Sequence, residues 1–126
     1  MAGLVSDIGH ILVGVEDMDR ALAFYRDGLG FQVVGKADPM WTVVAVPGGQ
    51  LTLYKQERVT PIALGEEGLA TPISLHVANF EEAARALEAG GERVEPGDPH
   101  HGLVWDPFGN VLELHDHRKG EEVRRL

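Results

Sequence analysis

The first half of the chain combines short apolar runs with one helical pattern. Residues 8–15 (IGHILVGV) are mostly apolar and β-branched, which predicts a strand. Asp17 is a favourable N-cap for a helix that follows, and Gly28 and Gly30 are placed to end it. Apolar residues between these points recur at the spacing of one helical face: Met18, Ala21, Leu22, Tyr25 and Leu29. Further strands are predicted over residues 31–35, 41–46 and 51–56.

The second half repeats this order of elements. Residues 73–78 predict a strand, and Asn79 followed by Glu82 has the form of a capping box at the start of a helix. Gly90 and Gly91 would end that helix. Candidate strands follow over residues 92–95, 103–106 and 111–117, with a turn over 107–110. His100 and His101 come directly after Pro99, so we expect them in an exposed turn.

Matching anchor points indicate an internal duplication. The two caps, Asp17 and Asn79, are 62 residues apart, and the segments 51–53 and 112–114 are 61 residues apart. We therefore predict one α+β domain over residues 1–126, built from two βαβββ modules. The predicted parts are module 1 over about 7–57, a connector over about 58–71, module 2 over about 72–117 and a charged tail over 118–126.

Length, charge and cysteine content narrow the function classes. A chain of 126 residues is the size of one domain. With 11 Lys and Arg against 20 Asp and Glu, its net charge is −9, which argues against a nucleic-acid partner and against docking on an anionic membrane. The absence of cysteine excludes a disulfide scaffold and thiolate chemistry. No apolar run approaches the ~20 residues of a membrane span, and the first residues lack a signal-peptide pattern, so we expect a cytoplasmic protein.

Two segments resemble a known superfamily. The opening IGHILVGVEDMDRALAFYRDGLGF and the late WDPFGNVLEL, within paired βαβββ units, are similar to the glyoxalase / bleomycin-resistance / extradiol-dioxygenase proteins, also called the vicinal-oxygen-chelate superfamily. The resemblance covers residues 7–117. It implies two curved sheets around a concave pocket, a small organic molecule as partner and a homodimer. Enzymes of this superfamily hold a divalent metal that the substrate chelates through adjacent oxygens.

The resemblance implies metal ligands at four strand positions, and this chain has a suitable ligand residue at two of them. His10 and Glu113 match, and Glu113 would be the catalytic carboxylate if the protein is an enzyme. Thr52 and Pro72 occupy the other two positions, so the ligand set is incomplete. His76 could replace the missing ligand only if the strand register differs, because four strand residues span about 13 Å. A metal held there would be a divalent ion such as Zn, Mn, Fe or Ni.

Strand parity outward from His10 and Glu113 predicts the rest of the pocket. Alternate residues of a strand share a face, and this parity selects Thr52, Tyr54, Ser74, His76, His115 and His117. For the last two of these histidines, the alternative is a position in solvent beyond the pocket. Trp41 and Trp105 are large enough to wall an apolar cavity, or they pack in the core.

The sequence leaves two functions open. A third alternative is a protein that keeps the fold but has no ligand of its own. Thr52 and Pro72 favour a small-molecule binding protein without a metal, like the bleomycin-resistance members. His10 and Glu113 favour a divalent-metal-dependent lyase, isomerase, thiol transferase or dioxygenase.

Overall fold

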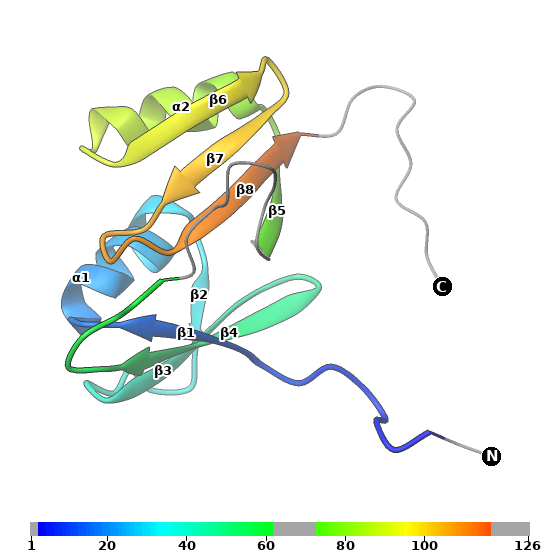
Figure 1. The fold of residues 1–126 in the computed structure, drawn as a ribbon, viewed down its shortest axis with the longest axis vertical. Coiled ribbons are helices and arrows are strands. Elements are labelled where there is room, and N and C mark those ends of the chain that lie inside the picture. Colours follow the sequence, from blue (N-terminus) through cyan, green and yellow to red (C-terminus); the bar gives the residue numbers. More distant parts are fainter. Residues whose placement is uncertain (1–2, 62–72, 117–126) are drawn as a thin grey trace. The chain divides into compact units, whose positions relative to one another are not determined.

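A computed structural model of the chain describes residues 3–61 and 73–116 and divides into two compact units, residues 1–59 and 60–126 (Figure 1). The first unit contains β1 (Ile11–Val15), α1 (Met18–Leu22), η1 (Ala23–Gly28), β2 (Gln32–Val34), β3 (Trp41–Val46) and β4 (Gly49–Lys55). Its strands form one sheet in the order β1-β4-β3-β2, in which β1 and β4 run parallel and the other neighbours antiparallel.

The second unit has the same topology. It contains β5 (Ile73–Val77), α2 (Phe80–Ala89), β6 (Arg93–Asp98), β7 (His101–Trp105) and β8 (Val111–Asp116). Its sheet order is β5-β8-β7-β6, again with the first pair parallel. Leu12 pairs with Thr52 in the first sheet, and Ser74 pairs with Glu113 in the second. The predicted duplication of a βαβββ unit is confirmed, with the offsets read from the sequence.

Both predicted N-caps are confirmed. The Asp17 side chain accepts a hydrogen bond of 2.9 Å from the backbone amide of Arg20. The Asn79 side chain accepts one of 2.9 Å from the amide of Glu82. Each cap satisfies a backbone donor that the first helical turn leaves without an intrahelical partner.

The first helix departs from the predicted regular pattern. After Leu22 the chain winds as the π-helix η1, in which the amide of Leu29 bonds to the carbonyl of Phe24, five residues earlier. Phe24 and Tyr25 are thereby both buried, although neighbours on a regular helix point 100° apart. Their rings meet edge to face with centroids 4.9 Å apart. The wider winding buries two adjacent aromatic rings against the core of the sheet.

Each sheet packs one face against its own helix. In the first unit this face carries Val13, Val15, Val44, Leu51 and Leu53. In the second unit it carries Val104, Leu112 and Leu114, which lie under Phe80, Ala84 and Leu87 of α2. Burying these side chains is the main stabilising contribution of each unit.

Two predicted boundaries are wrong in ways that affect the site. β1 begins at Ile11, so His10 precedes the strand. β7 begins at His101, two residues before the predicted start, so His101 belongs to a strand and only His100 lies in the turn. The expected turn rested on Pro99, but the strand already includes Gly102. This residue is glycine because a Cβ there would meet Phe80 Cζ and the Glu95 carbonyl oxygen, both at 2.6 Å.

In the described residues, no helix has the length and apolar character needed to cross a membrane.

Candidate functional site

The face of the first sheet opposite its helix carries exposed apolar side chains. Val43 pairs with Thr52 and Trp41 with Tyr54, so these four residues share that face, as strand parity predicted for Thr52 and Tyr54. Trp41 is 50% exposed and Tyr54 45%, and Leu12 on the neighbouring strand is 70% exposed. Trp41 therefore lies outside the core, and its ring is available to a bound molecule.

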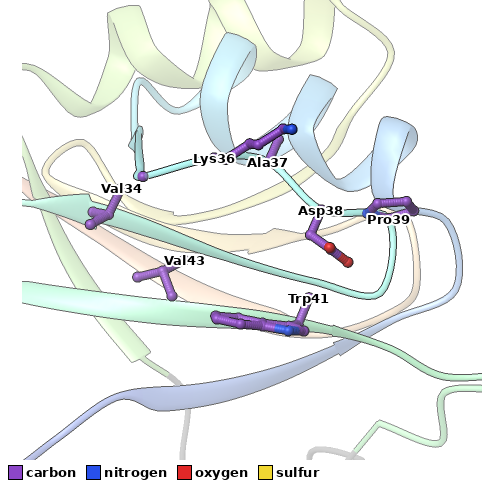
Figure 2. A pocket seen from close by; sticks show the side chains of 8 residues that line it. Val34, Lys36, Ala37, Asp38, Pro39, Trp41 and Val43 are labelled. Atoms are coloured by element: carbon purple, nitrogen blue, oxygen red, sulfur yellow. The ribbon is translucent and has the colours of Figure 1, made fainter.

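A cavity of about 530 Å³ lies where β3 meets the connection from β2. Figure 2 shows Trp41 and Val43 on the strand, with Lys36, Asp38 and Pro39 on the loop across from them. The remaining lining residues are Val34, Gly35 and Ala37. This volume falls in the range of small-molecule sites, about 300–1,000 Å³.

Trp41 was predicted from the sequence as a pocket residue, but the loop that completes this cavity was not. The loop is fixed by hydrogen bonds: Thr42 Oγ1 donates to the Asp38 carbonyl oxygen (2.8 Å) and accepts from the Asp38 amide (3.0 Å). The Asp38 carboxylate accepts from the amide of Met40 (2.8 Å). The available signal was Asp-Pro just before the strand, which marks a turn, beside an aromatic residue at the strand's first position.

His10 and Thr52 form a side-chain pair on the same sheet. The distance between His10 Nδ1 and Thr52 Oγ1 is 2.6 Å. Thr52 is buried, whereas His10 lies exposed just before β1. The hydroxyl orients the imidazole over the helix-free face, which brings together two residues that the resemblance selected.

Ser74 and Glu113 form the corresponding pair of the second unit. Ser74 Oγ donates to Glu113 Oε1 across the parallel strands at 2.7 Å. Both side chains lie on the face opposite α2, because the alternate residues Leu112 and Leu114 are buried on the other side. Structure and parity agree that Glu113 does not face the helix layer.

The residues at the four strand positions that the resemblance selected do not complete a metal site. His10 offers an imidazole and Glu113 a carboxylate, whereas Thr52 offers a hydroxyl already bonded to His10. Pro72 lies outside the described residues, and a proline side chain has no donor atom. An open catalytic metal usually has three protein ligands, so these residues do not fit one. Within residues 3–61 and 73–116, no three His, Asp or Glu side chains form a ready-made metal group.

The other predicted residues of the second unit lie on the same helix-free face as Glu113. His76 pairs with His115, one step along the strands from Ser74 and Glu113, and their ring centroids are 5.8 Å apart. Trp105 is covered by Arg93, whose guanidinium carbon lies 3.8 Å from the ring centroid, so a cation already covers part of this aromatic surface. His117 lies outside the described residues.

Behind this face, a buried carboxylate ties β8 to α2. Asp116 accepts from the amide of Phe80 at 2.9 Å and lies 2.8 Å from His100 Nδ1. The amide hydrogen bond from Phe80, helped by His100, holds the pKa of the Asp116 carboxyl below its usual value despite burial. This contact fixes the end of β8 that carries His115.

The sequence of residues 7–114 matches the family model of the Glyoxalase/Bleomycin resistance protein/Dioxygenase superfamily. No curated protein matches the chain significantly. Among solved structures, the fosfomycin resistance protein FosX from Listeria monocytogenes is 15% identical, with a TM-score of 0.72 over 91% of this chain and 96% of that one. The lactoylglutathione lyase from Agrobacterium tumefaciens is 23% identical, with a TM-score of 0.63 over 90% and 96%. TnmS3, an antibiotic binding protein from a Streptomyces species, is 20% identical, with a TM-score of 0.67 over 91% and 98%.

Proposed function

The chain belongs to the glyoxalase/bleomycin resistance protein/dioxygenase superfamily, and from this premise we propose that it binds a small organic molecule rather than turning one over at a metal. The observation that carries the proposal is the exposed aromatic and aliphatic surface around Trp41 and Tyr54, beside a cavity of about 530 Å³. Soluble proteins seldom leave such groups together in water without a partner. TnmS3, an antibiotic binding protein, shares the fold.

The chemistry of this surface describes the ligand class. Trp41 and Tyr54 offer flat faces for a ring, and Val43 adds an aliphatic contact in the cavity beside Trp41. Lys36 on the loop can meet an anionic or hydrogen-bond-accepting edge of the ligand. We therefore propose a flat, largely apolar ligand with polar groups at its rim. On the second unit, we propose ligand contacts at polar residues of the helix-free sheet face: Ser74, His76, Glu113 and His115.

A metal-dependent enzyme is the second candidate. His10 and Glu113 occupy the two matched ligand positions, and FosX and the lactoylglutathione lyase share the fold. The incomplete donor set places this candidate behind ligand binding. In an enzyme, Glu113 would hold or move a proton, and its bond from Ser74 would orient the carboxylate.

Fluorescence titration of paired tryptophan variants tests the first candidate. Anilinonaphthalene sulfonate, a flat anionic probe of apolar surfaces, is added to wild type, Trp41→Ala and Trp105→Ala. We expect Trp41→Ala to weaken the probe's affinity about tenfold, a loss of about 1.4 kcal/mol. Trp105→Ala is the matched control, because Arg93 already covers that ring. Equal affinity in all three proteins would reject the Trp41 surface as the site.

Metal content separates the two candidates. Untagged protein is purified, and its metal is measured by mass spectrometry. The binding function predicts substoichiometric metal in wild type and in His10→Ala. One tightly held ion per chain in wild type, lost in His10→Ala, would favour the enzyme.

A cytoplasmic location is part of the proposal and is tested by fractionating cells that express the protein.

A further inference from the structure

The carboxylate of Asp38 is a charged group on the wall of the cavity beside Trp41. Asp38 lies on the loop between β2 and β3, and Trp41 is the first residue of β3. Figure 2 shows the carboxylate pointing from the loop toward the strand that carries Trp41. An aromatic face and a negative charge therefore border one cavity, and the ligand contacts proposed so far leave this charge unused.

The loop itself fixes the orientation of this carboxylate. Asp38 Oδ1 accepts the 2.8 Å hydrogen bond from the Met40 amide, and Thr42 Oγ1 holds both the amide and the carbonyl of Asp38. Thr42 is buried, so the loop is anchored to the core of its unit. Asp38 Oδ2 receives no hydrogen bond from any residue that the structure describes. One oxygen thus positions the side chain, and the other can accept from a ligand.

No lysine or arginine in the described part of the chain neutralises Asp38. Lys36 lines the same cavity but makes no ion pair with Asp38, and Figure 2 shows its amine extending to the side away from Trp41. The whole chain carries a net charge of −9, so its long-range field also favours a cation over an anion. The charge at the cavity therefore favours a positive group on the bound molecule.

The aromatic side chains beside the carboxylate attract a cation in their own right. Trp41 pairs across the sheet with Tyr54, and about half of each side chain is exposed. The negative face of a tryptophan ring attracts ammonium and guanidinium groups. The second unit already contains such a contact, in which Arg93 lies 3.8 Å from the ring centroid of Trp105. Over residues 3–61 and 73–116, no cation of the chain covers Trp41 in this way.

We propose that this cavity binds the ammonium group of a ligand, a protonated or alkylated amine, between the Asp38 carboxylate and the Trp41 ring. The inference rests on the proposed function and specifies the charge of the ligand. The apolar part of the ligand lies along Val34 and Val43, which pair on the helix-free face, and its positive end lies at the loop. The carboxylate supplies the opposite charge, and the ring supplies a face that needs no hydrogen bond from the ligand.

Three probes that share a benzene ring and differ in charge test the site: phenyltrimethylammonium, its neutral isostere tert-butylbenzene, and the anion benzenesulfonate. Binding to the full chain is followed through the indole NH signals of Trp41 and Trp105 in proton–nitrogen NMR spectra. We expect the cation to shift the Trp41 signal and to bind about fivefold more tightly than the neutral probe. The Trp105 signal should stay in place, because Arg93 covers that ring. Added salt should weaken binding of the cation and leave that of the neutral probe unchanged.

Two charge variants assign the preference to Asp38. Asp38→Asn keeps an acceptor oxygen for the Met40 amide and removes the negative charge. It should lose the preference for the cation and bind tert-butylbenzene as wild type does. Glu81→Gln is the matched control, because it changes the net charge equally at an exposed position on α2 of the other unit. It should bind all three probes as wild type does, and circular dichroism confirms that each variant is folded.

The outcomes separate the ammonium site from the function on which it rests. Equal affinity of wild type for the three probes, tightest binding of benzenesulfonate, or a cation preference that Asp38→Asn retains would each overturn the ammonium site. In these cases, binding of tert-butylbenzene that Trp41→Ala weakens would leave the small-molecule binding function standing. If no probe shifts the Trp41 signal, both proposals fail.

Discussion

The carboxylate of Asp116 accepts a 2.9 Å hydrogen bond from the backbone amide of Phe80, at the first residue of α2. The contact joins the last described residue of β8 to the helix that covers the same sheet. It also satisfies an amide that the helix leaves without an internal partner, and it places a negative charge at the positive end of the helix dipole. Asp116 is therefore a structural carboxylate, although it follows directly on His115 of the helix-free face.

The first prediction concerns acid stability. The pKa of Asp116 is lowered in the folded chain, chiefly by the Phe80 amide, so ionisation favours folding. This stabilisation is present above the unfolded pKa of about 3.9 and is lost as pH falls through the lower folded pKa. We expect Asp116→Asn to lower the free energy of unfolding at neutral pH, with a difference from wild type that shrinks below about pH 4. Urea melts across that range measure it, and a difference independent of pH would contradict the assignment.

The second prediction concerns the packing of α2 on its sheet. A Cβ at Gly102 would lie 2.6 Å from Phe80 Cζ, and the Glu95 carbonyl oxygen is equally close. We expect Gly102→Ala to cost about 1–3 kcal/mol of unfolding free energy, because the ring and the backbone must both move. Gly49→Ala is the matched control, since a Cβ there has no neighbour within 4 Å. Equal thermal melts for the two variants would show that the close approach is not limiting.

The third prediction concerns the turn that leads into β8. Asp106 Oδ1 accepts from the amides of Phe108 and Asn110, both at 2.9 Å, and Oδ2 accepts from Asn110 Nδ2 at 2.8 Å. Asp106→Ala leaves these donors without their acceptor and should cost about 1–3 kcal/mol. Asp106→Asn keeps one acceptor oxygen and should cost less. Chemical denaturation measures the order, and a reversed order would contradict it.

The fourth prediction concerns assembly. The resemblance to the superfamily implies a homodimer, and a second copy would cover apolar side chains of the edge strand β1, where Ile11 is 41% and Leu12 70% exposed. We expect sedimentation equilibrium to give twice the chain mass at micromolar concentration. A monomer over the same range would reject the dimer while leaving the ligand-binding proposal intact, because the cavity lies within one unit.

The features predicted correctly from the sequence depend on local rules. Asp17 and Asn79 cap helices because their side chains reach an amide three residues on, which needs no tertiary information. Alternation along a strand likewise places Thr52 with Tyr54, and Glu113 with His115, on one face of their sheets. The duplication followed from matching these local signals at a constant offset.

The features that were missed depend on contacts between elements. The π-helix buries the adjacent residues Phe24 and Tyr25, which helical periodicity does not suggest. His101 was placed in a turn because it comes soon after Pro99, although it is the first residue of β7 and pairs with His115. The cover of Arg93 on Trp105 depends on the pairing of β6 with β7, which the sequence pattern does not specify.

The last prediction concerns the His10–Thr52 pair. Their 2.6 Å contact joins an exposed imidazole to a buried hydroxyl, so Thr52 is the partner that holds His10 over the helix-free face. Thr52→Val keeps the shape of the side chain and removes the hydroxyl. We expect it to cost about 0.5–1.5 kcal/mol of unfolding free energy and to release the His10 ring, visible as a changed balance of imidazole tautomers by nitrogen NMR. Thr52→Ser retains the hydroxyl and should preserve the wild-type tautomer. If Thr52→Val leaves the His10 spectrum unchanged, another group orients the imidazole. The position of His10 would then depend on the chain before β1 rather than on Thr52 of β4.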